Sequence, residues 1–261
     1  MGKELEKAGS KELQANMMGM LAQDSQKHTG FENMTAEDIA LPFLTILQAL
    51  SPQVRGQNKI DGASEGDFYN TVTQEAHKGV LKIIPCAFKK AYVEWTPREQ
   101  GGGYVKEHVN SQILDSTHKN EKNQDALPNG NIIVTTAYHY VLVVKDNTVE
   151  RAIISFTSTQ LKKSRRWNSQ MMNIQIKLPS GELITPPMFS HVYAAKTVSE
   201  SNDLGQWSGW DISSPMMIDD MKLYVRAKTF SEDIAKGLVK VAPPSPSDEH
   251  TAKPPINSEI L

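Results

Sequence analysis

The segment 131-NIIVTTAYHYVLVVKDN-147 decides the fold class of this chain. Its β-branched and aromatic residues are typical of a strand, and the run ends in the turn-forming residues 145-KDNT-148. The following segment, 149-VERAIISF-156, has the same composition. Together the two segments predict a β-hairpin at the centre of a sheet.

Further strands are predicted on both sides of this hairpin. Residues 79-GVLKIIPCAFKKAYVEW-95 are β-branched and aromatic with partial alternation, and Pro85 indicates an edge or a bulge. Residues 101–109 follow as their partner strand, and residues 186–201 and 209–215 continue the pattern. The sequence therefore predicts a chain that is mostly strands, as a β-barrel or a sandwich with insertions.

Two helices are expected within this mainly β core. One begins near Gln160, where Thr157 and Gln160 have the spacing of a capping box. The other covers residues 219–238, with Asp219 and Asp220 at its start and Gly237 as its C-cap. Residues 35–53 fit either a capped helix or a strand, because Pro42 interrupts the helical pattern. The predicted fold class is α+β, mainly β with a few helices.

Composition divides the chain into three parts. Residues 1–30 are polar and mixed in charge, which predicts a mobile N-terminal arm with at most a short helix. Residues 31–241 form the predicted single domain. Residues 242–261 hold five prolines and few apolar groups, so we expect a disordered, weakly acidic tail.

Overall charge and cysteine content exclude several classes of protein. The chain has 28 Lys and Arg against 30 Asp and Glu, so binding of nucleic acid through bulk charge is excluded and any anion site must be local. The single cysteine, Cys86, excludes an intramolecular disulfide and a cysteine-based zinc site. The first residues lack an apolar signal core, and no apolar run is long enough to span a bilayer, so we expect a cytoplasmic protein without membrane contact.

Motifs for catalysis are missing from the sequence. There is no GxxxxGK[ST] phosphate loop, no HExxH and no GxSxG, and the seven histidines are scattered. His139, in a predicted strand without a second ligand nearby, is read as structural. The sequence therefore predicts a protein that is not an enzyme and that holds neither a cofactor nor a metal.

The most unusual stretch is 157-TSTQLKKSRRWNSQMM-172, which gathers Lys162, Lys163, Arg165 and Arg166 next to Trp167. On a helix these cations would bind phosphates, and the indole would stack on a base. The competing interpretation is a solvated helix face with Trp167 in the core. The lack of any Asp or Glu between residues 151 and 181 favours the binding interpretation, because a solvated helix usually carries both signs of charge.

Three further segments combine aromatic residues with loops or strand edges. A flexible glycine-rich loop at residues 92–108 carries Tyr92, Trp95, Arg98, Tyr104 and Lys106, and it could close over a single strand of nucleic acid or serve only as a hairpin connection. Residues 65–73 contain adjacent Phe68 and Tyr69, of which one ring should face outward. Residues 199–211 place Trp207 and Trp210 in a polar loop, where exposed tryptophans often mark binding sites.

These segments resemble a group of tailed-bacteriophage proteins associated with single-stranded DNA binding. The resemblance runs through most of residues 35–215 and is carried by LPFLTILQALSP (41–52), GDFYNTVT (66–73), YVEWTPREQGGGYV (92–105), TSTQLKKSRRWNS (157–169) and ESNDLGQWSGW (200–210). It implies an elaborated OB-like β-barrel that coats strands during phage replication or recombination, in the cytoplasm of the bacterial host. Such proteins often end in a strongly acidic tail with a terminal aromatic residue, whereas this chain ends in NSEIL.

The leading hypothesis is a non-enzymatic protein that binds single-stranded DNA without sequence preference. The expected contacts are Lys162, Lys163, Arg165, Arg166, Trp167, Tyr69, Trp95, Arg98, Tyr104 and Lys106. The alternative is a phage protein-binding factor, a virion component or an inhibitor of a host enzyme, that uses its aromatic loops as interface anchors. A nuclease or recombinase subunit is a third option. Replication proteins of host or phage are candidate partners, and the sequence leaves the oligomeric state open.

Overall fold

The computed structural model describes residues 2–27, 29–35, 38–56, 58–146, 148–202, 205–239 and 241. The chain divides into two compact units, Met1–Ile39 and Ala40–Leu261. The predicted tail, residues 242–261, lies outside the described residues. The first unit contains helix α1, Gly2–Lys27, which is longer than the short helix expected in this region. Its side chains from residue 13 to residue 27 are all exposed.

The centre of the second unit is three long antiparallel strands, β4 (Leu81–Trp95), β8 (Ile132–Val144) and β9 (Val149–Thr157). β8 pairs with β9 along the predicted hairpin and with β4 on its other edge. The ladder between β4 and β8 shifts register between Pro85 and Ala87. Proline cannot donate a ladder hydrogen bond, which explains why the irregularity lies there and confirms the predicted bulge.

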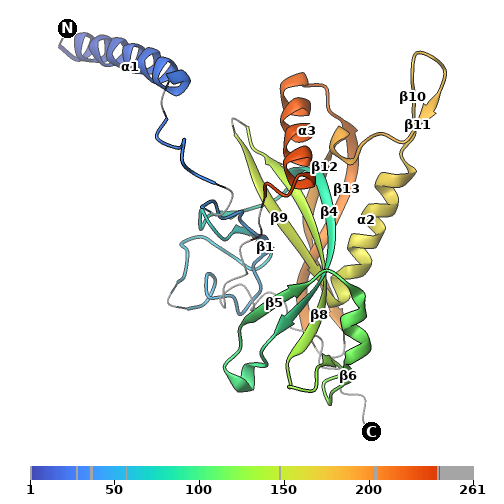
Figure 1. Cartoon of the computed structure of the whole chain (residues 1–261). Coiled ribbons are helices and arrows are strands. Elements are labelled where there is room, and N and C mark those ends of the chain that lie inside the picture. Colours follow the sequence, from blue (N-terminus) through green and yellow to red (C-terminus); the bar gives the residue numbers. More distant parts are fainter. Residues whose placement is uncertain are drawn as a thin grey trace. The chain divides into compact units, whose positions relative to one another are not determined.

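Two of the long strands, β4 and β8, each carry two partners in succession along one edge. The first residues of β4 pair with β12 (His191–Asn202), and its last residues pair with β5 (Tyr104–His108). β8 likewise pairs with β9 over one part and with the short β7 (Asp125–Ala126) near its start. β13 (Gly205–Met217) pairs with β12, and β6 (His118–Lys119) pairs with β7. The result is one large sheet that curls into a half-barrel (Figure 1).

Helices cover opposite faces of this sheet. Ile83 belongs to the same apolar cluster as Trp167 of α2 (Leu161–Asn173). The next residue of β4, Ile84, belongs to the cluster of Phe230 of α3 (Met221–Ala235). Since successive strand residues point to opposite faces, α2 and α3 lie on opposite faces of the sheet. This explains why the middle of β8 is buried at every position instead of alternating.

α3 ends as its sequence predicts. The side chain of Asp220 accepts hydrogen bonds from the backbone N–H groups of Lys222 and Leu223, which is an N-cap. Gly237 follows the last turn with a φ of 72°, and its N–H donates to the carbonyl of Ile234. A left-handed residue directly after a helix favours glycine, so both predicted ends of this helix are confirmed.

The ambiguous segment 35–53 contains a strand, β1 (Leu44–Ile46), which pairs with β2 (Phe68–Asn70). This segment bridges the two outer strands of the half-barrel. The N–H of Ile153 on β9 donates to the carbonyl of Pro42 at 2.8 Å, and the side-chain amide of Gln48 exchanges two 2.9 Å hydrogen bonds with the backbone of Ser208 on β13. Residues 42–48 therefore join β9 to β13 across the open side of the sheet.

The remaining elements are short. They are β3 (Ala76–His77), β10 (Ile176–Lys177), β11 (Leu183–Ile184) and four 3₁₀ turns, η1 (Arg98–Gln100), η2 (Ser111–Ser116), η3 (Ser158–Gln160) and η4 (Met188–Ser190). The chain is thus mainly β with a few helices, as predicted. Over the described residues no strand pair joins β9 directly to β13, so the OB-like barrel stays a prediction.

Candidate nucleic-acid interface

Helix α2 turns Trp167 toward the core. Its buried residues are Ser164, Trp167 and Met171, spaced by three and four positions, so they share one face of the helix. Trp167 is 1 % exposed and packs edge-on against Tyr193. The prediction that this indole stacks on a base is therefore wrong, since neither face of the ring is accessible. The apolar interior of the half-barrel holds the ring instead.

A buried pair of polar side chains anchors α2 to β8. His139 lies 2.8 Å from the hydroxyl of Ser164, and its ring stacks on Trp167 with centroids 4.6 Å apart. Burial lowers the pKa of His139 to about 3, so the imidazole is neutral at neutral pH. Its Nδ1 has no hydrogen-bond partner among the described residues. The pair resembles a nucleophile and its base, but both side chains are buried and no carboxylate among the described residues contacts the ring, so we interpret the pair as a structural contact.

Lys163 is held by a carboxylate from a distant strand. Its Nζ lies 2.6 Å from Oε1 of Glu200 on β12 and donates to the carbonyl of Trp210 at 2.7 Å. Burial raises the pKa of Glu200, but hydrogen bonds from Lys163, Gln160 and Trp207 outweigh it and hold the pKa below its usual value. Lys163 thus neutralises a half-buried carboxylate and is removed from the predicted phosphate contacts.

Gln160 belongs to the same network instead of a capping box. Its amide nitrogen donates to Oε2 of Glu200 at 2.7 Å, and its amide oxygen accepts from the N–H of Trp210. The indole of Trp207 donates to the same Oε2 at 2.9 Å. A Cβ at Gly209 would lie 2.5 Å from that oxygen, so only glycine lets Glu200 approach β13 this closely.

Four of the five segments that carried the sequence resemblance meet around this carboxylate. Residues 41–52 contribute Gln48, which binds Ser208 beside Gly209. Residues 66–73 contribute Phe68, whose ring packs on Trp210 at 5.0 Å. Residues 157–169 and 200–210 contribute the network itself. The shared pattern of these segments therefore marks the place where the half-barrel is held together.

Tyr69 lies in the core as well. The short strand β2 buries both of its aromatic rings, with Phe68 fully buried and Tyr69 8 % exposed. The expectation that one ring faces outward is wrong, because every residue of β2 is buried although successive side chains point to opposite faces. Tyr69 is therefore excluded as a stacking residue.

The outer surface of α2 presents the other three cations of the run. Lys162, Arg165 and Arg166 are exposed, and in the described part of the chain none of them forms an ion pair. They lie along the helix face away from Trp167, which follows from the 3.6-residue period. An anion approaching this face meets three unpaired positive charges within five residues.

The glycine-rich segment is a hairpin connection, one of its two predicted roles, because β4 and β5 pair on either side of η1. Trp95 and Tyr104 face each other across β4 and β5 with an edge-to-face geometry at 5.9 Å, and both pack against the apolar cluster beneath α3. Lys106 is exposed, 4.0 Å from the buried Glu94, which also contacts His108 at 2.8 Å. Arg98 is exposed in η1. The two rings are therefore partly buried by each other and by this cluster.

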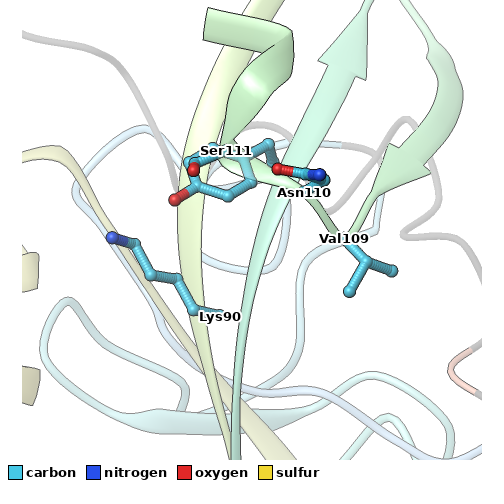
Figure 2. A pocket seen from close by; sticks show the side chains of 5 residues that line it. Lys90, Val109, Asn110 and Ser111 are labelled. Carbon is cyan, nitrogen blue, oxygen red and sulfur yellow. The ribbon is translucent and has the colours of Figure 1, made fainter.

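The sequence interpretation missed a strip on β4 in which Phe88 and Lys90 are exposed and Tyr92 is buried. Phe88, Lys90 and Tyr92 alternate along the strand and share the face on which α2 packs. Lys90 lies over the ring of Tyr92, with Nζ 5.5 Å from its centroid. Lys90, Tyr92, Val109, Asn110 and Ser111 line a shallow open hollow beside the strand (Figure 2). The signal was the partial alternation along AFKKAY, which the sequence interpretation used only to predict a strand.

Comparison with known proteins gives one match. Residues 9–240 match the family described as Pam3 phage gp34-like protein. The chain belongs to the Pam3 phage gp34-like family. The match covers α1 from residue 9 onward and the second unit up to residue 240, and it associates the chain with a phage. No curated protein and no solved structure matches this member of the Pam3 phage gp34-like family.

Neither a metal centre nor a membrane-spanning helix is found among the described residues. No group of three His, Cys, Asp or Glu side chains lies close enough together there to hold a metal ion. No helix of that part of the chain combines the length and apolar character needed to cross a bilayer.

Proposed function

We propose that this Pam3 phage gp34-like protein binds single-stranded DNA without catalysing a reaction on it. The outer face of α2 supports this most strongly, because Lys162, Arg165 and Arg166 stand exposed and unpaired, among the described residues, on a chain whose formal charge is only −2. Exposed cations gathered at one place on a nearly neutral protein bind polyanions by releasing counterions. In the phage context, the strands would be those of replication or recombination.

The half-barrel gives these cations a rigid base. Trp167, Ser164 and the Lys163–Glu200 pair fix α2 on its inner side, so the three outer cations keep their spacing. A preorganised cationic surface loses less conformational entropy on binding than a flexible one. The position of α2 on a strongly curled sheet also agrees with the OB-like arrangement that we propose for this fold.

The test is titration of a fluorescent oligothymidylate at several salt concentrations. We expect binding that weakens steeply with salt and that exceeds binding to a duplex of the same length. Replacing Lys162, Arg165 and Arg166 by Gln should flatten the salt slope by roughly 2, at about 0.7 for each lost phosphate contact. Tighter binding to duplex, or a slope unchanged in this variant, would contradict the proposal.

A matched variant controls for net charge. Lys222 and Lys228 are exposed on α3, which covers the opposite face of the sheet, and the exposed Lys236 directly follows its last residue, Ala235. Their replacement by Gln removes the same charge from a helix of similar length. If both triple variants lose the same affinity, bulk charge explains the binding, and α2 is not the interface.

A second candidate, a phage protein-binding factor, has one observation in its favour. Met216, Met217, Met221 and Val225 are all more than half exposed where β13 passes into α3. Methionines adapt to irregular partner surfaces and are frequent at protein-binding sites. Replacing Met216 and Met221 by Gln should abolish capture of a phage or host protein if this candidate holds, and should leave oligothymidylate binding unchanged under the leading proposal.

A further inference from the structure

The buried positions of Trp167 and Tyr69 leave the proposed strand-binding surface without its expected stacking rings. Phe88 on β4 supplies an aromatic face that the sequence interpretation did not consider. It is 41 % exposed, although the residues before and after it on β4 contribute largely to the core. Exposure of a phenylalanine on a central strand is unusual, because a neighbouring element normally covers it.

Phe88 lies one side chain away from α2. Its ring meets His139 edge-on at 5.1 Å, and His139 in turn stacks on Trp167 and contacts Ser164. Arg165 follows Ser164 directly. On the helix, Arg165 lies about 200° around from Lys163, which is tied to β13. The free cation therefore points to the flank of α2 that faces away from β13.

The strip continues from Phe88 with positive charge. Lys90 is the next residue on the same face of β4, about 7 Å further along the strand. It is exposed, and no carboxylate among the described residues pairs with it. Lys106, opposite Glu94 in the neighbouring ladder, adds a further exposed cation on this face. The hollow of Tyr92, Asn110 and Ser111 lies beside Lys90 and offers an amide and a hydroxyl (Figure 2).

From this juxtaposition we propose that Phe88 stacks on a base of bound single-stranded DNA and that Lys90 contacts the adjoining phosphate. The DNA then runs from the outer face of α2 along β4 to the hollow. The inference rests on the proposed function. Charge complementarity indicates that single-stranded DNA occupies this surface. Cations and an aromatic ring follow one another along β4 at the spacing of alternate β-strand residues, which fits a single strand of DNA with splayed bases. Among the described residues Lys90 has no ion-pair partner and Lys106 has only the 4.0 Å contact with Glu94, so both present positive charge that suits a phosphate backbone better than a protein surface of mixed charge.

The first test replaces Phe88 by Leu, which keeps apolar packing on His139 but removes the aromatic face. We expect affinity for oligothymidylate to fall about 10-fold with an unchanged salt slope. Affinity for an abasic strand of the same length should not change, because that strand has no base to stack. Phe88→Trp should keep the affinity, and its added emission should be quenched by oligothymidylate. Equal affinity of the Leu variant for oligothymidylate, or an equal loss on the abasic strand, overturns the proposal.

The second test replaces Lys90 by Gln, with Lys82→Gln as the matched control. Lys82 is exposed on the same strand, and in the ladder alternation it lies on the α3 side of the sheet. Lys90→Gln should flatten the salt slope by about 0.7 while the control leaves it unchanged. Identical slopes for both variants overturn the assignment of Lys90.

The same measurements separate this inference from the function on which it rests. Suppose the triple Gln variant of α2 loses affinity for oligothymidylate and the Phe88→Leu variant does not. The protein then binds single-stranded DNA through α2, but the bound DNA does not run along β4. If the wild-type protein binds neither oligothymidylate nor the abasic strand, the proposed function fails, and this inference fails with it.

Discussion

Lys162 and Lys163 are neighbours in the sequence and differ completely in their surroundings. Lys163 lies inside a network of Glu200, Gln160 and Trp210 that joins α2 to the hairpin of β12 and β13. Lys162 is exposed, with no ion-pair partner in the described part of the chain. The two faces of α2 therefore hold similar residues for different reasons: the inner face stabilises the half-barrel, and the outer face is available for a ligand.

This difference shows how a cluster of charge in a sequence should be divided. In the run KKSRRW, Lys163 neutralises a carboxylate and Trp167 fills the core. The other three cations are exposed. Helix periodicity separates these groups by about 100° per residue, so adjacent residues have different roles. Substitutions on the inner face of α2 should therefore change the stability of the protein, and substitutions on its outer face should not.

Truncation of the inner face should have the largest effect. Trp167→Ala removes the largest fully buried side chain and leaves a cavity between Tyr193 and His139. The free energy of unfolding should fall by about 3–5 kcal/mol, which denaturant melts can measure. The Gln variant of the three outer cations should lose about 0.5 kcal/mol or less per substitution. A Trp167→Ala protein with nearly wild-type stability would show that the two faces do not differ in this way.

Replacement of Lys163, compared with replacement of its neighbour Lys162, should have the next largest effect on stability. Lys163→Gln leaves the half-buried Glu200 without its charged partner, so the unfolding free energy should fall by about 2–3 kcal/mol. Lys162→Gln should leave it almost unchanged. A double-mutant cycle with Glu200→Gln checks the cause, because the loss from Lys163→Gln should shrink when the carboxylate is absent. Full additivity in this cycle would mean that Lys163 stabilises the fold through contacts other than Glu200.

The response to acid should be a smaller effect, also confined to the inner face. The unfolded chain protonates His139 near its ordinary pKa of 6.5, whereas the folded chain keeps it neutral down to about 3. Protons therefore bind preferentially to the unfolded state, and stability falls as the pH falls below 6.5. Between pH 6.5 and about pH 5 the loss from this group is about 2 kcal/mol.

His139→Phe isolates this contribution. Burial also lowers the pKa of His77 and of His191, so they act in the same direction, and the wild-type protein alone cannot assign the effect. Denaturant melts of both proteins at the two pH values should show a smaller loss in the Phe variant. The same pH dependence in both proteins would place the titrating group elsewhere.

The sequence predicted the parts of the fold that depend on local patterns. The hairpin of β8 and β9, the bulge at Pro85 and the ends of α3 all follow from neighbouring residues, and all are confirmed. The spacing of Ser164, Trp167 and Met171 also carried a local signal for the buried face of α2. The sequence interpretation followed the charges instead and placed Trp167 on the surface.

The rest of the site depends on contacts between distant residues. No local pattern links Lys163 to Glu200 or Gln48 to Ser208, because curling of the sheet brings them together. Phe88 was missed for a related reason: an alternating strand predicts which residues share a face, but the neighbouring elements decide whether that face is covered. Here α2 covers His139 and leaves Phe88 partly open.

The bridge across the half-barrel also constrains the order in which the protein can fold as it is synthesised. Gln48 and Ser208 are 160 positions apart, so the ribosome must make most of the chain before their two hydrogen bonds can form. Before β13 is synthesised, residues 42–48 cannot form their hydrogen bonds to it. The apolar side chains of Leu44, Ile46 and Phe68 then lack Trp210, which belongs to the same core cluster. A nascent chain shorter than about 210 residues thus exposes an apolar, unfinished interior, the kind of surface that chaperones recognise.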